Sequence, residues 1–224
     1  MKTILGLLSV VGLTSIAAVL ARSDGEPESV VSTLPAPQEW KNRPETWKAD
    51  NEQLRITAGK STDWYISPVD GIRRANAPVL LFKPAKDFIL TAKVTPEHAE
   101  KWDAGVLMVY ANDSTWAKLA LEKSMYMEPT IVTVVTRGVS DDCNSAVVSG
   151  GSIWFRVVKR GDAIGFFSST EGSSWKLVRA FTLGPAPELR VGLGSQSPVG
   201  KGSTTVFSDI SYKPVAVKDF LAGQ

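Results

Sequence analysis

The chain has 224 residues, with 25 basic and 23 acidic side chains and a formal net charge of +2. This balance, without a long basic run, excludes the positively charged surface typical of nucleic-acid-binding proteins, so we expect no nucleic-acid partner. A single His and a single Cys exclude a histidine-rich metal site and an internal disulfide, and we expect neither a metal nor a cofactor.

The first residues have the pattern of a secretory signal peptide. Lys2 gives a positive start, residues 4–20 are almost wholly apolar, and Ala21 ends the run with a small residue. A single-pass anchor is the alternative, but Gly, Ser and Thr within the run weaken it as a membrane span. We therefore expect cleavage of residues 1–21, and a secreted protein, extracellular or periplasmic, with no stable membrane anchor.

The rest of the chain divides by composition. Residues 22–37 are rich in Ser, Pro and acidic side chains and indicate a linker or disordered arm. One folded domain is expected over residues 38–216, followed by a short C-terminal tail at 217–224. About 180 residues are enough to bury a sizeable core.

The domain reads as a series of short strands separated by Gly, Pro, Asn and Asp, with no sustained helical stripe of apolar residues. This pattern predicts an all-β fold in which two antiparallel sheets pack as a β-sandwich of jelly-roll type. The predicted strands are 53–58, 63–66, 78–82, 88–94, 105–110, 116–123, 130–136, 153–159, 163–168, 175–181, 188–195 and 204–212.

The strand at 116–123 is the centre of the prediction. Its pleat sends Ala117, Leu119 and Leu121 to one face and the alternate residues to the other. The second face then carries Trp116, Lys118 and Glu122, an aromatic ring, a cation and a carboxylate suited to a sugar. Lys118 and Glu122 lie about 13 Å apart along the strand, at ~3.3 Å per residue, so each must meet a partner from another strand or a ligand. An ordinary solvated face, with Trp116 covering a neighbour, is the alternative.

Further motifs recur in order along the domain: Trp40-Lys41-Asn42, Thr62-Asp63-Trp64, Trp102-Asp103-Ala104-Gly105, Trp116-Ala117-Lys118, Glu122, Val134-Val135-Thr136, Ser140-Asp141, Phe155-Arg156-Val157, Trp175 and Arg179. As a set they resemble the domain-of-unknown-function family 1349, also labelled regulation-of-enolase-1-like, of the concanavalin A-like superfamily. The resemblance implies a jelly-roll β-sandwich with a concave face, often attached to carbohydrate-active proteins. Together with the pattern at 116–123, it gives these candidate ligand-binding residues: Asp63, Trp64, Trp116, Lys118, Glu122, Thr136, Asp141 and Arg179.

An enzyme acting on glycosides would need two carboxylates across a cleft. Glu122 is the candidate catalytic residue, and the possible partners are Asp63, Asp103 and Asp141. A Glu beside Lys118 or Arg179 would have its pKa lowered, which suits a ligand anchor and opposes a general acid.

Six other residues carry weaker signals. His98 is expected to be a solvated loop residue, and Cys143 a small buried one. Asp141, Asp142 and Asn144 offer oxygen ligands but lack the spacing of a calcium loop, which favours a solvated turn. Asn112 begins a glycosylation pattern on a predicted hairpin turn.

We therefore expect a secreted carbohydrate-binding or surface-interaction domain whose partner is an oligo- or polysaccharide. One alternative is a glycoside-acting hydrolase or lyase with Glu122 in its site. The other is a structural module without a small ligand. The residues favour binding over catalysis.

Overall fold

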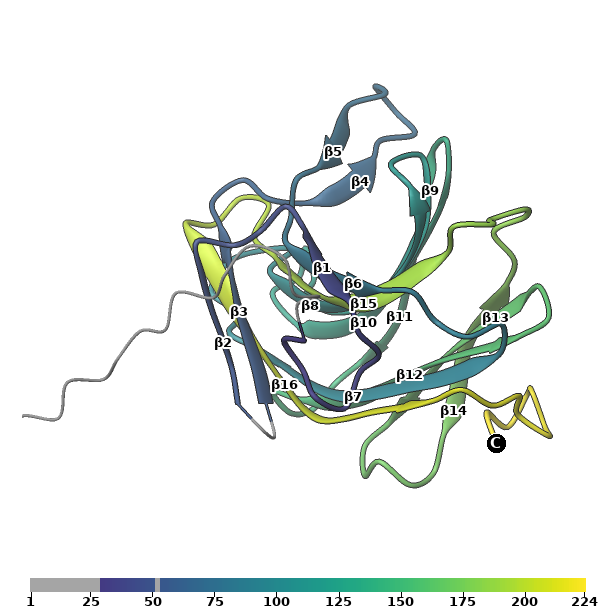
Figure 1. Cartoon of the computed structure of the whole chain (residues 1–224). Helices are drawn as coiled ribbons and strands as arrows, with labels where there is room; N and C mark the ends of the chain where they lie inside the picture. Colours follow the sequence, from purple (N-terminus) through teal and green to yellow (C-terminus); the bar gives the residue numbers. More distant parts are fainter. Residues whose placement is uncertain (1–28, 51–52) are drawn as a thin grey trace, which may run out of the picture.

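The computed structural model describes residues 29–50 and 53–224. The regular secondary structure of these residues consists of β-strands (Figure 1). The predicted signal peptide at 1–21 and the start of the predicted arm lie outside the described residues. Within the described part of the chain, no helix is long and apolar enough to cross a membrane.

Two seven-stranded antiparallel sheets form a sandwich, as the sequence predicts. Sheet A has the order β1 (Gln38–Lys41), β6 (Val79–Phe82), β15 (Arg190–Gln196), β8 (Ala104–Asn112), β9 (Thr115–Lys123), β10 (Pro129–Arg137), β11 (Ser140–Val147). Sheet B has the order β14 (Lys176–Phe181), β13 (Ala163–Ser169), β12 (Ile153–Arg160), β7 (Phe88–Pro96), β16 (Gly202–Lys213), β3 (Gln53–Gly59), β2 (Thr46–Ala49). A separate hairpin joins β4 (Trp64–Ile66) to β5 (Arg73–Ala75).

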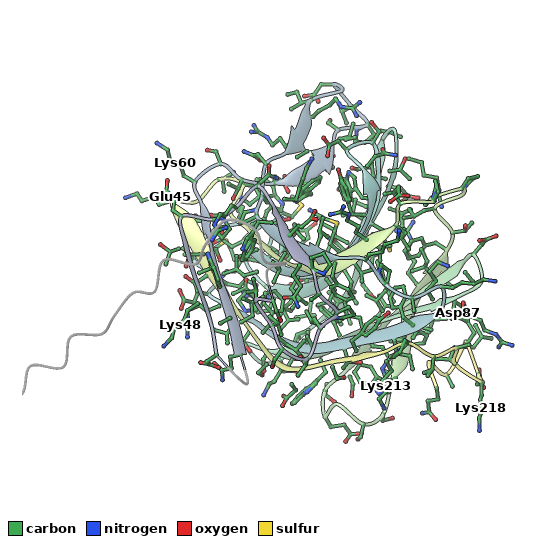
Figure 2. The ribbon with its side chains drawn as sticks, in the orientation of Figure 1. Glu45, Lys48, Lys60, Asp87, Lys213 and Lys218 are labelled. Carbon is green, nitrogen blue, oxygen red and sulfur yellow. The ribbon has the colours of Figure 1, made fainter. Side chains whose placement is uncertain are left out.

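The main apolar core lies between the two sheets. Figure 2 shows side chains filling this space, while Glu45, Lys48 and Lys60 point outward at the edge of the molecule. Leu119 and Leu121 of β9 are fully buried in this core, which confirms the face assigned to them from the alternation. Other members of the core are Leu107, Val109 and Leu193 of sheet A, and Leu90, Phe155 and Phe166 of sheet B.

A second apolar cluster covers part of the outer face of sheet A, the face turned away from sheet B. The β4–β5 hairpin packs there and places Trp64 against Trp116 of β9, with ring centroids 5.8 Å apart and planes inclined at 75°. The Trp64 indole N–H donates to the Ala77 carbonyl oxygen at 2.9 Å. The hairpin covers this part of sheet A, so both faces of β9 are buried at the position of Trp116.

Both ends of the described chain pack onto the sandwich. Val31 and Leu34 are buried in the main core, and the Gln38 amide holds their segment by accepting from Val31 N at 2.8 Å and donating to Leu34 O at 3.1 Å. At the other end Val217 is buried, and Arg156 donates to the Gly223 carbonyl oxygen at 2.7 Å. The described part of the predicted arm, residues 29–37, is therefore packed against the core, since two apolar side chains anchor it.

Four strands were not anticipated from the sequence: β1, β2, β5 and β11. The first three have only three or four residues each. β11 is a polar edge strand in which only Ser140 is buried. Such a strand lacks the apolar alternation that indicates a half-buried element.

Candidate functional site

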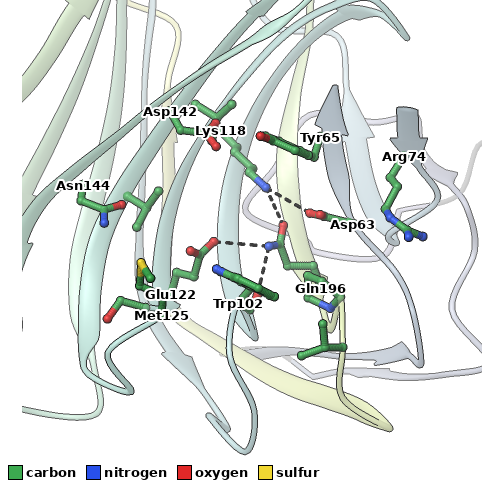
Figure 3. Close-up of a pocket in the computed structure, with 15 residues that line it drawn as sticks. Asp63, Tyr65, Arg74, Trp102, Lys118, Glu122, Met125, Asp142, Asn144 and Gln196 are labelled. Carbon is green, nitrogen blue, oxygen red and sulfur yellow. Dashed lines mark hydrogen bonds and ion pairs between the residues drawn. The ribbon is translucent and has the colours of Figure 1, made fainter. Parts of the chain in front are cut away.

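A cavity of about 400 Å³ opens on the outer face of sheet A, beside the β4–β5 hairpin (Figure 3). Strands of sheet A supply its floor, and the hairpin and nearby loops supply its walls. The lining residues are Asp63, Tyr65, Arg74, Trp102, Lys118, Glu122, Ser124, Met125, Val132, Val134, Asp142, Asn144, Gln196, Pro198 and Val199.

The register of sheet A brings polar residues together from strands distant in sequence. Ala104 of β8 pairs with Glu122 of β9 on one side and with Gln196 of β15 on the other. Because Ala104 has a small side chain, the longer Glu122 and Gln196 side chains can meet above it. In the same way, Val134 of β10 lies between Lys118 and Asp142.

Lys118 is buried at the floor of the cavity, with a side chain only 3% exposed. Its ammonium donates to Trp64 O at 2.8 Å, to Gln196 Oε1 at 2.9 Å and to Asp63 Oδ1 at 3.3 Å. An ammonium has three N–H donors, so these partners use all of them. The partners of Lys118 come from other elements, as the strand spacing required.

Gln196 connects Lys118 to Glu122. Because the Gln196 Oε1 atom accepts from Lys118, its amide nitrogen faces the other way and donates to Trp102 O at 3.0 Å and to Glu122 Oε2 at 3.5 Å (Figure 3). The chain of hydrogen bonds therefore fixes one carboxylate oxygen of Glu122 and the backbone of Trp102. Sequence reasoning missed Gln196 because its predicted strand, 188–195, stopped one residue short of it.

Glu122 is a buried carboxyl group, 8% exposed. Burial raises its pKa to about 8, and the nearby carboxylates of Asp63 and Asp142 add to this, while the attraction of Lys118 opposes it. The lowered pKa expected for a Glu beside Lys118 is wrong, because desolvation of the carboxylate outweighs the attraction. Glu122 is therefore mostly protonated at neutral pH.

Asp142 and Asn144 reach the cavity from β11, where they pair with Val134 and Val132. They belong to a strand, so the solvated turn predicted for this segment is wrong. The pKa of Asp142 is raised, chiefly because neighbouring atoms keep water from its carboxylate. Strand alternation could have predicted that Asp142 and Asn144 share a face, had the polar segment been recognised as an edge strand.

Trp102 supplies an exposed aromatic ring at the cavity. Its side chain is 41% exposed, and its backbone has a left-handed φ of 67°. Two hydrogen bonds hold this conformation: Trp102 N donates to Lys123 O at 2.6 Å, and Trp102 O accepts from Gln196. No pattern in the sequence distinguished Trp102 from the other Trp residues as the ring exposed at the cavity.

Three of the predicted binding residues line the cavity together: Asp63, Lys118 and Glu122. Trp64 and Trp116 do not, because each is fully buried in the contact between hairpin and sheet. The expectation that Trp116 presents its ring to a ligand is therefore wrong.

The other three predicted binding residues lie outside the cavity lining. Thr136 is buried, with its hydroxyl 2.9 Å from that of Ser140. Arg179 of β14 pairs instead with Asp141, at 3.0 Å, and thereby links the two sheets. Asp103, suggested as a partner carboxylate, accepts from Ser197 Oγ at 2.7 Å and from two backbone N–H groups, so it secures loops. The carboxylates that share the cavity with Glu122 are those of Asp63 and Asp142.

His98 and Cys143 also differ from expectation. His98 is partly buried, with Nε2 3.2 Å from Leu121 O, and burial lowers its pKa. Cys143 is exposed on β11. Across residues 29–50 and 53–224, no three His, Cys, Asp or Glu side chains are placed to hold a metal ion.

Comparison with known proteins places this architecture in a family. Residues 40–215 match the family described as "Protein of unknown function (DUF1349)", which confirms the resemblance drawn from the motifs. Regulation of enolase protein 1 from Saccharomyces cerevisiae is 24% identical over 174 residues, 77% of this chain and 87% of that protein.

Solved structures share the fold. A functionally unknown protein from Saccharomyces cerevisiae superposes with a TM-score of 0.74 and 23% identity, over 80% of this chain and 97% of that one. The GH43 protein BlXynB from Bacillus licheniformis superposes with a TM-score of 0.62 and 16% identity, over 77% of this chain and 35% of that one. The match to BlXynB therefore spans about a third of that protein.

Proposed function

We propose that this chain, which belongs to the family described as "Protein of unknown function (DUF1349)", binds carbohydrate in the cavity on the outer face of sheet A. The observation that carries the proposal is one exposed Trp ring, Trp102, in the same cavity as the carboxyl groups of Glu122 and Asp142. A sugar has an apolar face of C–H groups and a rim of hydroxyl groups. An aromatic wall beside hydrogen-bonding side chains complements both.

The size and rigidity of the site support the proposal. A cavity of about 400 Å³ is within the range of small-molecule sites. The hydrogen bonds from Lys118 through Gln196 hold Glu122 and Trp102 in place before any ligand arrives, so little ordering is needed on binding. The fold shared with the GH43 protein is compatible with carbohydrate binding.

A glycan array probed with the exported protein, followed by calorimetry on the sugars that bind, tests the proposal. Trp102→Ala should reduce affinity at least tenfold with little change in melting temperature, because the ring is partly exposed. Trp154→Ala is the matched control, since Trp154 lies on sheet B against Lys93 and does not line the cavity. Equal loss of binding in both variants, or no glycan bound at all, would refute a sugar site here.

A glycoside hydrolase is the second candidate, and the raised pKa of Glu122 favours it. A general acid must hold its proton near neutral pH, and a pKa of about 8 satisfies this. Glu122→Gln should then abolish turnover of a chromogenic glycoside while leaving its affinity nearly intact. If the protein only binds sugars, the wild type shows no turnover to lose. A protein with neither binding nor turnover would be a structural module.

We also propose that the protein is exported, on the pattern of residues 1–21. Intact-mass analysis of the protein recovered outside the cytoplasm should find a chain that begins at Arg22. Recovery of a chain that still begins at Met1 would contradict cleavage.

A further inference from the structure

Resting on the proposed function, we infer that the cavity selects an amino sugar with a free ammonium group over neutral and acidic sugars. Some polar atoms of the cavity wall are already paired within the protein, whereas others are left for a ligand.

The buried cation of the cavity has nothing to offer a ligand. All three N–H donors of Lys118 are used by Trp64 O, Gln196 Oε1 and Asp63 Oδ1. The two N–H groups of the Gln196 amide are likewise used, by Trp102 O and Glu122 Oε2. A ligand rich in acceptors, such as a uronic acid, would find no unpaired N–H donor on Lys118 or Gln196.

Glu122, unlike Lys118, keeps an acceptor atom that has no partner within the described part of the protein. Its side chain is more than nine-tenths buried and lines the cavity. One oxygen, Oε2, accepts a single long hydrogen bond of 3.5 Å from Gln196. No residue of the described part of the chain bonds the other oxygen, Oε1. This oxygen is accessible from the cavity, so a donor on the ligand can bond it there.

The other charged groups around the cavity reinforce this preference. Asp142 faces it from β11 and Asp63 from the segment before β4, and each raises the pKa of Glu122. Three carboxyl groups therefore surround a space in which Lys118 is the buried counter-charge. Arg74, on β5, is an exposed cation at the opposite wall (Figure 3). A cationic sugar would orient its ammonium toward Glu122 and Asp142, away from Arg74.

The cation that fits is organic and not a metal ion. The three carboxyl groups do not converge closely enough to form a metal site, as no such cluster is present among the described residues. The cavity is instead large enough for a sugar ring, and Trp102 borders it beside Glu122 (Figure 3). An aromatic face attracts both the C–H face of a sugar and a nearby ammonium.

Calorimetry at about pH 6 on three matched β-1,4-linked tetrasaccharides tests the inference: glucosamine, its N-acetylated form, and glucose. The glucosamine oligomer should bind at least tenfold more tightly than the other two. Equal or tighter binding of a neutral oligomer would overturn the inference while supporting carbohydrate binding. Binding of none of the three, with glycans found on the array, would also overturn it. An array without any hit would overturn the proposed function as well.

A substitution at Glu122 and a measurement of proton release distinguish a direct contact with the ligand from an effect on the stability of the protein. Glu122→Gln should lower the affinity for the glucosamine oligomer at least tenfold, and by more than it lowers the affinity for neutral sugars. Asp141→Asn, which removes an exposed carboxylate outside the cavity, should change neither. Binding of the ammonium should release a proton from Glu122, seen as a dependence of the heat on the buffer's ionisation enthalpy, and the Gln variant should lose this release. Wild-type binding without proton release would contradict the contact.

Discussion

The buried carboxyl group of Glu122 makes the stability of this protein depend on pH in a direction opposite to that of a paired surface carboxylate. Its pKa is about 8 in the folded protein, whereas an unperturbed Glu has a value of 4.5. Between these two values the folded state keeps a proton that the unfolded state has lost. The free energy of unfolding therefore decreases as pH rises from about 4.5 to about 8 and levels off above that window.

The size of this decrease follows from the same two values. One unit of pKa difference corresponds to about 1.4 kcal/mol, so the slope is at most about 1.4 kcal/mol per pH unit. Over the whole window the contribution is on the order of 5 kcal/mol, as an upper bound. Glu122→Gln keeps the shape of the side chain and removes its titration, so its stability should change less with pH. In the Glu122→Gln variant, a smaller decrease of stability with rising pH should remain, because the pKa of Asp142 is also raised.

Urea unfolding at about pH 5.5, 7 and 8.5, followed by Trp fluorescence, measures both proteins. The wild type should lose several kcal/mol between the first and last pH, and its free energy of unfolding should fall relative to that of Glu122→Gln as pH rises. Parallel curves for the two proteins would show that Glu122 is ionised at neutral pH in the folded state, and would refute the reasoning from burial.

Three further substitutions test the structure around the site. Trp116→Ala should destabilise the protein by about 3–5 kcal/mol in urea unfolding, because the ring is fully buried under the hairpin; a loss of sugar affinity with unchanged stability would contradict this. Lys118→Met should also cost about 3–5 kcal/mol and lower sugar affinity, since it removes the cation paired with Asp63 and the donor to Gln196 Oε1; a fully stable variant would mean that these bonds are weak. Gly192→Ala should prevent native folding, as judged by circular dichroism, because its Cβ would lie 1.8 Å from Leu80 O; a native spectrum would refute the close approach.

The sequence by itself determined the fold class and the two faces of β9. Period-two alternation and frequent turn residues are local properties, so they predicted an all-β sandwich correctly without knowledge of strand order. The same alternation placed Leu119 and Leu121 in the main core and Lys118 and Glu122 on the opposite face. The motifs from Trp40 onward identified the family, because their order along the chain is itself a sequence property.

Tertiary structure alone decided what lies above that second face. Alternation cannot distinguish a face open to solvent from one covered by a distant hairpin, and so Trp116 was expected at the ligand when Trp64 in fact buries it. Gln196 and Asp142 come from strands on either side of β9, and only the sheet order brings them beside Glu122.

The pKa of Glu122 likewise depends on one contribution that the sequence indicated and on another that only the tertiary structure decided. The sequence supplied the neighbouring Lys118, whose attraction lowers the pKa of the carboxyl group. Burial, which depends on every surrounding chain segment, raises it by more. The identity of the charged groups was therefore readable from the sequence, but the balance between attraction and desolvation required the packed structure.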